Sequence, residues 1–122
     1  MTDRKLLEAA ARAAELTGFT FINGTGAVYD PKPGVMQPYR RWNPLTDDGD
    51  ALRLAVKLGL SPEVHLDAAQ PLPWLRVVRR FRDRRGQYDE AWTYVDPKTY
   101  AADPYAATRR AIVRAAAEME PK

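Results

Sequence analysis

Apolar residues recur at helical spacing in three segments of the chain. The first segment begins after Thr2 or Asp3, either of which can cap a helix, and Gly18 can end it in a left-handed conformation. The second begins at the acidic residues after Thr46 and ends at Gly59, and the third begins at Asp103. The apolar stripes are Leu6, Leu7, Ala10, Ala13 and Ala14, then Ala51, Leu52, Leu54, Ala55 and Leu58, and finally Ala107, Ala111, Ile112, Ala115 and Met119. The spacing therefore predicts three helices.

Aromatic and β-branched residues gather in short runs between the predicted helices. Residues 19–22 and 27–29 flank Asn23-Gly24, which is typical of a hairpin turn or of one strand followed by a tight turn. Four prolines or glycines then predict a loop over residues 30–45, because proline lacks an amide donor and fixes φ. Residues 64–66 predict a short strand. Residues 75–83 and 88–95 predict a hairpin around the turn at 84–87.

Strand hairpins mixed with helices are typical of an α+β protein. We expect a three-layer α/β/α-type sandwich, in which three helices pack on a mostly antiparallel sheet of about 4–5 strands. No linker divides the chain, and 122 residues are in the usual size range of one domain, about 100–150 residues. We therefore expect residues 1–122 to form a single domain.

The composition excludes several kinds of site. The chain has no cysteine and one histidine, His65, which excludes disulfides, thiolate nucleophiles, Cys-based zinc sites, iron–sulfur clusters and His-pair metal sites. No apolar run approaches the ~20 residues of a membrane span, and the first residues predict an amphipathic helix without a signal-peptide core. We expect a cytoplasmic protein that does not enter a membrane.

Three local patterns bear on enzymatic chemistry. The sequence Asn23-Gly24-Thr25-Gly26 has no third glycine and no helix behind it, so it predicts a turn and not a phosphate-binding loop. The acidic residues 47–50 lack the terminal glutamate of an EF-hand loop; they favour a helix start, while weak Mg²⁺ binding stays open. Neither His65 nor Ser61 stands in a nucleophile–base arrangement. We therefore expect a non-enzymatic protein with no cofactor and no dedicated metal site.

Arginines are concentrated in the predicted 75–95 hairpin. The net charge of the whole chain is only +3, but a local field of this kind attracts anions, and the neighbouring rings of Tyr88, Trp92 and Trp74 can stack on a base. The alternative is a solvated strand with cross-strand ion pairs to Asp89 and Glu90. The candidate binding residues, for an anion or for a partner, are Arg76, Arg80, Arg82, Arg84, Arg85, Trp92 and the separate pair Arg40 and Arg41.

One segment carries a family resemblance. Residues 42–51 read W-N-P-L-T-D-D-G-D-A, which resembles the W-N-P-x-x-D-x-x-D-A motif of small phage and prophage proteins with an ABA-sandwich domain. The Ala- and Arg-rich end of the chain, residues 103–113, is similar to the end of such proteins. The resemblance implies no catalytic residues. The motif positions are Trp42, Asn43, Pro44, Asp47 and Asp50. We interpret them as structural residues in preference to a binding site, since Asn43-Pro44 sets an extended approach to the helix.

Two functions are compatible with the sequence. The resemblance implies a phage or prophage accessory protein that binds a host or phage protein, and fold-level analogy alone extends this to an inhibitor of a bacterial defence system. The arginine-rich hairpin indicates instead a module that binds a nucleotide or a nucleic acid. The sequence leaves the oligomeric state open.

Overall fold

A computed structural model describes residues 2–69 and 71–120 of the chain. Within these ranges the protein is α+β, with four helices and two three-stranded antiparallel sheets. The elements are α1 (Asp3–Ala13), β1 (Thr20–Ile22), β2 (Thr25–Tyr29), β3 (Tyr39–Arg41), α2 (Asp48–Leu58), β4 (Leu60–His65), β5 (Trp74–Arg82), β6 (Tyr88–Val95), α3 (Pro97–Ala102) and α4 (Pro104–Ala117).

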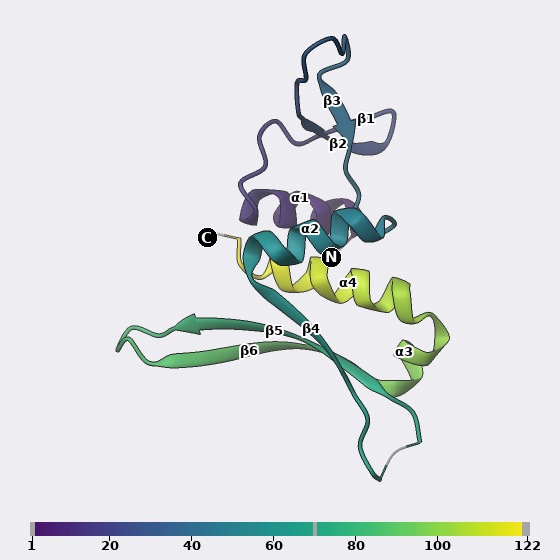
Figure 1. Ribbon diagram of the computed structural model, residues 1–122, viewed down its shortest axis with the longest axis vertical. Helices are drawn as coiled ribbons and strands as arrows, with labels where there is room; N and C mark the ends of the chain where they lie inside the picture. The colour runs from purple at the N-terminus through teal and green to yellow at the C-terminus, as the bar shows by residue number, and fades with distance from the viewer. Residues whose placement is uncertain (1, 70, 121–122) are drawn as a thin grey trace.

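The helices lie between the two sheets (Figure 1). The sheet β1–β2–β3 is on one side of α1, α2 and α4, and the sheet β4–β5–β6 is on the other, where α4 contacts all three strands. Buried residues from both sheets and from the helices join in one core cluster, including Val28 and Trp42 from the first sheet side and Leu75 and Val77 from the second. The core is rich in alanine on α1 and α4, which lets these helices pack against each other closely.

The predicted α+β class is confirmed, but the single sheet of about 4–5 strands and the three-layer α/β/α arrangement are not. The strands divide into two sheets because the chain crosses the helix layer between them. It leaves β3 at Arg41, runs through α2, and turns at Gly59 directly into β4 on the opposite side. The described residues also contain a fourth helix, α3, where Asp96 caps the start and Pro97 occupies the first turn.

Helix ends follow the capping residues closely. Thr2 caps α1, Asp47 caps α2 and Asp103 caps α4, each through a side-chain oxygen that accepts a backbone N–H three residues on. Gly59 ends α2 at φ 68°, as predicted. Helix α1 ends earlier than predicted, at Ala13 and not near Gly18, because Glu15 adopts the left-handed conformation at φ 55° and closes the helix.

The first sheet contains the predicted hairpin and one strand that the sequence did not predict. Asn23 and Gly24 both have positive φ, at 53° and 78°, as a two-residue hairpin turn requires. Strand β3 lies within residues 30–45, which were predicted to be a loop, and pairs with β2 from Tyr29↔Tyr39 to Ala27↔Arg41. Prolines flank this strand but do not enter it, so its amide donors remain available for pairing.

The second sheet contains more residues than the sequence pattern predicts. Strand β4 begins at Leu60, four residues before the predicted strand, and it includes Ser61 and Pro62. Proline is tolerated there because β4 is an edge strand of the sheet. The β5–β6 hairpin has the predicted position, with Gly86 at φ 79° in its turn.

None of the helices within the described ranges has the length and apolar character that crossing a bilayer requires.

Candidate functional site

The face of the β4–β5–β6 sheet that points away from the helices carries an unusual set of side chains. Strand pairing places the partners of each pair on the same face, so the register defines this face directly. We call it the outer face. It consists of Ser61, Glu63 and His65 on β4, Trp74, Arg76, Val78, Arg80 and Arg82 on β5, and Tyr88, Glu90, Trp92 and Tyr94 on β6.

The opposite face of the same sheet belongs to the core. Leu75 and Val77 are fully buried there, and Thr93 and Val95 on β6 are also buried. Alternation along the strands therefore places the arginines and the exposed aromatic residues on the outer face. Arg76, Arg80 and Arg82 therefore project from the same face of the strand.

Val78 shows that the outer face has a packed layer of its own. Its register neighbours are Ser61 and Trp92, which places it on the side away from the helices. Its side chain is nevertheless 0% exposed, and it is not a member of the core cluster. The surrounding outer-face side chains must exclude water from it, so they form an ordered layer and not a set of independently solvated groups.

Glu63 is the charged centre of this layer. Arg76 Nε donates a hydrogen bond of 2.7 Å to Glu63 Oε1, and Arg80 donates one of 3.3 Å to Oε2. His65 Nε2 lies 3.0 Å from Glu63 Oε1. The pKa of Glu63 is lowered to about 2, first of all by the hydrogen bonds from Arg76 and His65. Partial burial of the carboxylate acts in the opposite direction, and the charge of Arg76 and the hydrogen bond from Arg80 lower the pKa further. The carboxylate therefore stays ionised and neutralises part of the arginine charge at any ordinary pH.

The guanidinium groups also contact aromatic rings. Arg76 Cζ lies 4.2 Å from the centroid of the Trp92 ring, and Arg82 Cζ lies 4.1 Å from that of Tyr88. Arg80 also faces Glu90 across the strands, at 3.5 Å. The predicted cross-strand pair with Glu90 is thus present, and Asp89 does not take part because it lies on the other face.

Aromatic residues complete the face where β4 ends and β5 begins. His65 stacks on Trp74 with ring centroids 4.5 Å apart, and Tyr94 lies 5.5 Å beyond Trp74. Three rings remain largely open to solvent: Tyr88 is 76% exposed, Trp92 57% and Tyr94 55%. Exposed, preorganised aromatic groups beside arginine are the typical composition of a binding surface.

The arginine side chains in the turn of the hairpin differ from those of the outer face in their ion pairs and hydrogen bonds. Asp83 Oδ1 accepts hydrogen bonds from the backbone N–H groups of Arg85 and Gln87, which organises the turn. The side chains of Arg84 and Arg85 are exposed, and within residues 2–69 and 71–120 neither makes a hydrogen bond or an ion pair.

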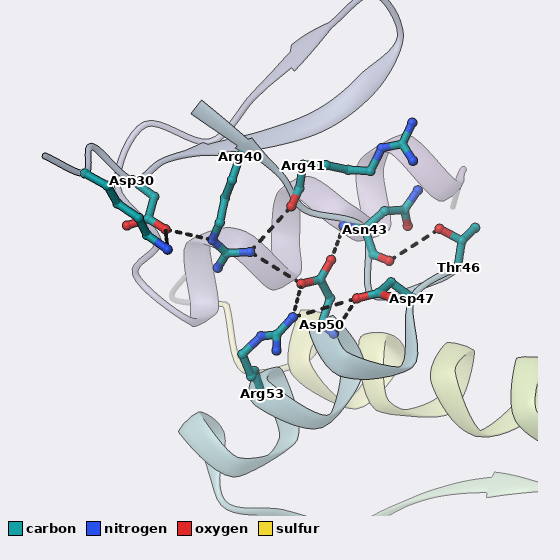
Figure 2. Close-up of polar contacts among 9 residues, drawn as sticks. Asp30, Arg40, Arg41, Asn43, Thr46, Asp47, Asp50 and Arg53 are labelled. Carbon is teal, nitrogen blue, oxygen red and sulfur yellow. Dashed lines mark hydrogen bonds and ion pairs between the residues drawn. The ribbon is translucent and has the colours of Figure 1, made fainter. Parts of the chain in front are cut away.

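The other predicted arginine pair lies far from the hairpin. Arg40 and Arg41 are on β3, in the sheet on the opposite side of the helix layer. Arg40 is bound to Asp30 at 3.1 Å and to Asp50 at 3.4 Å, as Figure 2 shows. Arg41 is exposed. The structure therefore does not combine these two residues with the hairpin arginines in one site.

The W-N-P-x-x-D-x-x-D-A positions form a junction between β3 and α2 (Figure 2). Trp42 and Pro44 are buried, and the Trp42 ring packs edge-on against Phe19 with centroids 5.4 Å apart. The Asn43 side chain accepts a hydrogen bond from the Leu45 N–H, and Asp47 caps α2.

Asp50 holds this junction together. Its carboxylate accepts hydrogen bonds from the Asn43 N–H at 2.9 Å and from Arg53 at 2.8 Å, and it pairs with Arg40. Burial by itself would raise the pKa of Asp50, but the hydrogen bonds and the two guanidinium charges outweigh it and lower the pKa. Donors therefore already surround this carboxylate, and no group of three or more metal-ligating side chains occurs in the described part of the chain.

Glu63, His65 and Tyr94 belong to the site, yet they were not among its predicted binding residues. Glu63 was missed because the predicted strand began at residue 64. The alternation of Ser61, Glu63 and His65 with Leu60, Pro62 and Val64 was the available signal. The turn residues Ser61-Pro62 after Gly59 obscured it, since they are also typical of a helix end.

A second, apolar depression lies between α2, α3 and α4. It has a volume of about 430 Å³, and its lining includes Leu52, Tyr100, Tyr105 and Ile112. Leu52 is 62% exposed and Tyr105 73% exposed. Arg109 and Asp48 close one side of the depression with an ion pair of 2.7 Å.

Comparison of the chain with protein-family models, with curated proteins and with solved structures found no match.

Proposed function

We propose that this protein is a non-enzymatic phage or prophage accessory protein that binds a host or phage protein through the outer face of the β4–β5–β6 sheet. The W-N-P-x-x-D-x-x-D-A resemblance supports the phage or prophage origin and a cytoplasmic place of action in a bacterial host. Inhibition of a bacterial defence system is an accessory role of this kind. The non-enzymatic part rests on the sequence, which places no nucleophile beside a base.

The observation that carries the proposal is the exposure of Trp92, Tyr94 and Tyr88 on a face that is already ordered. Tryptophan, tyrosine and arginine are enriched among the residues that supply most of the binding energy at protein interfaces, and the two aromatic residues bury a large area while losing little conformational entropy. Here the Arg76 guanidinium fixes the Trp92 ring from one side. A partner would therefore meet rigid aromatic groups and would not have to order them.

The pairing of the arginines favours a protein partner for this face over a phosphate-rich one. Arg76 and Arg80 are both bound to Glu63, and Arg80 is also paired with Glu90. A phosphate group would have to displace these carboxylates or accept their repulsion. A protein surface can contact the aromatic rings and leave the ion pairs in place.

The test is capture of partners by the tagged protein from nuclease-treated bacterial lysate, followed by mass spectrometry. We expect a protein retained in stoichiometric amount, and we expect Trp92→Ala with Tyr94→Ala to reduce its retention at least tenfold, since two central interface residues contribute about 2 kcal/mol or more each. The matched control is Leu52→Ala with Tyr105→Ala, which removes exposed apolar area from the depression beside α2.

Two results would contradict the proposal. One is a lysate in which no protein is retained at stoichiometric level. The other is capture that the control pair abolishes and the outer-face pair leaves unchanged, because the depression would then be the docking surface.

A second candidate function is binding of an anionic ligand, a nucleotide or a nucleic acid, by the hairpin. The specific observation in its favour is the turn, where Arg84 and Arg85 are exposed and do not pair with acidic side chains in the described part of the chain. These two residues, unlike Arg76 and Arg80, present guanidinium groups that a phosphate can reach without competition.

A further inference from the structure

Within residues 2–69 and 71–120, the last part of the β5–β6 hairpin pairs as a two-stranded ribbon, and its Arg80 side chain reaches back to Ser61 and Glu63 on β4. Strand β4 pairs with β5 only as far as Leu60↔Arg79. Beyond this point β5 and β6 pair alone, from Arg80↔Glu90 to Arg82↔Tyr88, and the hairpin projects past the helix layer (Figure 1). We call residues 80–90 the distal arm. Every residue of the distal arm except Asp83 is exposed.

Arginine side chains stand on both sides and at the tip of this ribbon, and of these Arg80 is already paired with Glu63 and Glu90. Arg80 and Arg82 point to the outer side, and Arg84 and Arg85 are at the tip. Arg79, at the base of the arm, lies on the inner side with its guanidinium 4.9 Å from the Phe81 ring. Of the three acidic residues in the arm, Asp83 is engaged by the backbone of the turn, so its carboxylate supports the tip and does not bind the tip arginines.

We infer that the distal arm binds double-stranded DNA by entering its major groove, an inference that rests on the second candidate function above. The major groove of B-form DNA is about 12 Å wide and 8.5 Å deep, and it admits a two-stranded β-ribbon. The paired part of the arm rises about 3.4 Å per residue. Its three pairs and turn therefore reach the depth of the groove while the three-stranded part of the sheet stays outside.

The positions of the arginines fit the two kinds of contact that such a ribbon makes. Arg84 and Arg85 at the tip reach the floor of the groove, where guanidinium is the common partner of guanine O6 and N7. Arg79 and Arg82 stand on opposite sides of the ribbon, where the phosphates line the groove. The groove in A-form RNA is too deep and narrow for this entry, so the geometry selects DNA duplex over RNA duplex.

The experiment measures binding of the full chain to a fluorescent 20-base-pair DNA duplex by anisotropy, over a range of salt concentrations. The same measurement is made with the corresponding single strand, with an RNA duplex of the same sequence, and with ATP. We expect the DNA duplex to bind more tightly than the other three. We also expect Arg84→Gln with Arg85→Gln to weaken duplex binding at least tenfold near 0.1 M salt and to leave the slope of log K against log salt nearly unchanged, because these two side chains contact bases and not phosphates.

The matched control is Lys57→Gln with Arg114→Gln, which removes the same charge from two exposed residues on α2 and α4. Equal weakening by both pairs would overturn the inference, because attraction to the net charge alone would explain it. Equal or tighter binding of the single strand, of the RNA duplex or of ATP would overturn it as well, and so would absence of duplex binding.

These outcomes are separable from those of the protein-docking test. The arm variants leave Trp92 and Tyr94 in place, and the lysate experiment is performed after nuclease treatment. Failure of duplex binding therefore leaves the docking proposal standing, and failure of partner capture leaves the duplex inference standing.

Discussion

The carboxylates of Asp50 and Glu63 each accept hydrogen bonds from several donors, but they stabilise different parts of the protein. Asp50 is buried and joins the end of β3, the following loop and the first turn of α2. Glu63 lies at the surface and joins three strand positions of the outer face. The first therefore supports the fold, and the second supports the arrangement of side chains at the candidate site.

We expect Asp50→Asn to lower the free energy of unfolding by about 1–3 kcal/mol, because the amide presents a donor where the carboxylate accepted charged hydrogen bonds. Denaturant unfolding measures the change. Asp48→Asn is the matched control on the same helix turn: its exposed pair with Arg109 contributes about 0–1 kcal/mol. A larger loss from Asp48→Asn than from Asp50→Asn would contradict this account of the junction.

Glu63 makes the stability of the protein depend on pH in the acid range. Its pKa is about 2 in the folded state and near 4.5 ordinarily. The ionised form is favoured by folding, so its stabilising effect is complete above the unfolded pKa and is lost as the pH falls from about 5 to about 2. We expect Glu63→Gln to make the unfolding free energy less dependent on pH in this window, as measured by denaturant titrations at several pH values.

A direct measurement follows the Glu63 side-chain carbon by NMR during acid titration. We expect a midpoint near pH 2 in the native protein and a higher midpoint in Arg76→Met, because the strongest donor is then lost. Glu118→Gln, an exposed glutamate after α4, serves as the control for the unfolding titrations. An unchanged Glu63 midpoint in Arg76→Met would contradict the arrangement.

The arginines of the site could be predicted from sequence, and the carboxylate that pairs with them could not. Arg76, Arg80 and Arg82 alternate with apolar residues within one strand, which is a local pattern. Glu63 and Arg76 are 13 positions apart in the sequence and lie on different strands, so their contact depends on the register of β4 against β5. Sequence alone does not fix this register, because the pairing is non-local.

At the scale of elements, Gly26 marks the closest approach between the first sheet and the motif. A Cβ at this position would lie 2.5 Å from the carbonyl oxygen of Trp42, which is a backbone atom and cannot rotate away. The Trp42 N–H in turn donates to the Gly26 carbonyl at 2.8 Å. The sheet and the loop before α2 are thus joined at a point where no side chain fits.

We expect Gly26→Ala to destabilise the protein by about 1–3 kcal/mol through this overlap and to alter the near-UV circular dichroism of Trp42. Gly24→Ala is the control. It has open space around its Cβ but a φ of 78°, so it adds backbone strain of about 1–2 kcal/mol without moving Trp42. A near-UV spectrum that changes equally in both variants would contradict the close-approach explanation.

Elements with their own end signals were predictable, and elements held by tertiary contacts were not. Helices α2 and α4 begin directly after their N-caps, Asp47 and Asp103, at the acidic positions that predict helix starts in the sequence. Strand β3 has three residues, two of them arginine, and it becomes a strand only because β2 offers its edge. The division into two sheets is likewise invisible in local patterns, since it depends on which side of the helices each hairpin packs.

At the scale of the molecule, the two sheets contribute unequally to the core. The second sheet buries Leu75, Val77 and Val95 against α4, whereas the first contributes Ala27 and Val28 from its central strand. Strand β1 has no buried residue, and neither has β3. The first sheet is therefore the part of the fold with the least apolar area to lose on opening.

We expect the amide protons of β1, β2 and β3 to exchange with solvent at least tenfold faster than those of β5 from Leu75 to Val78 and those of α4. The reason is that local opening of the first sheet exposes less buried surface than global unfolding does. Native-state hydrogen exchange measures this. Equal protection of both sheets would show that they open only together.

The distribution of the tryptophans gives the molecule optical probes at known places. Trp42 is buried at the junction of the first sheet, at 3% exposure, while Trp74 and Trp92 stand on the outer face of the second. We expect a soluble quencher such as acrylamide to reach the exposed Trp92 readily, the half-buried Trp74 in part, and Trp42 least of all. Contact at the outer face thus shields two emitters and leaves the third as an internal reference, so occupancy of this face can be followed by intrinsic fluorescence without a label.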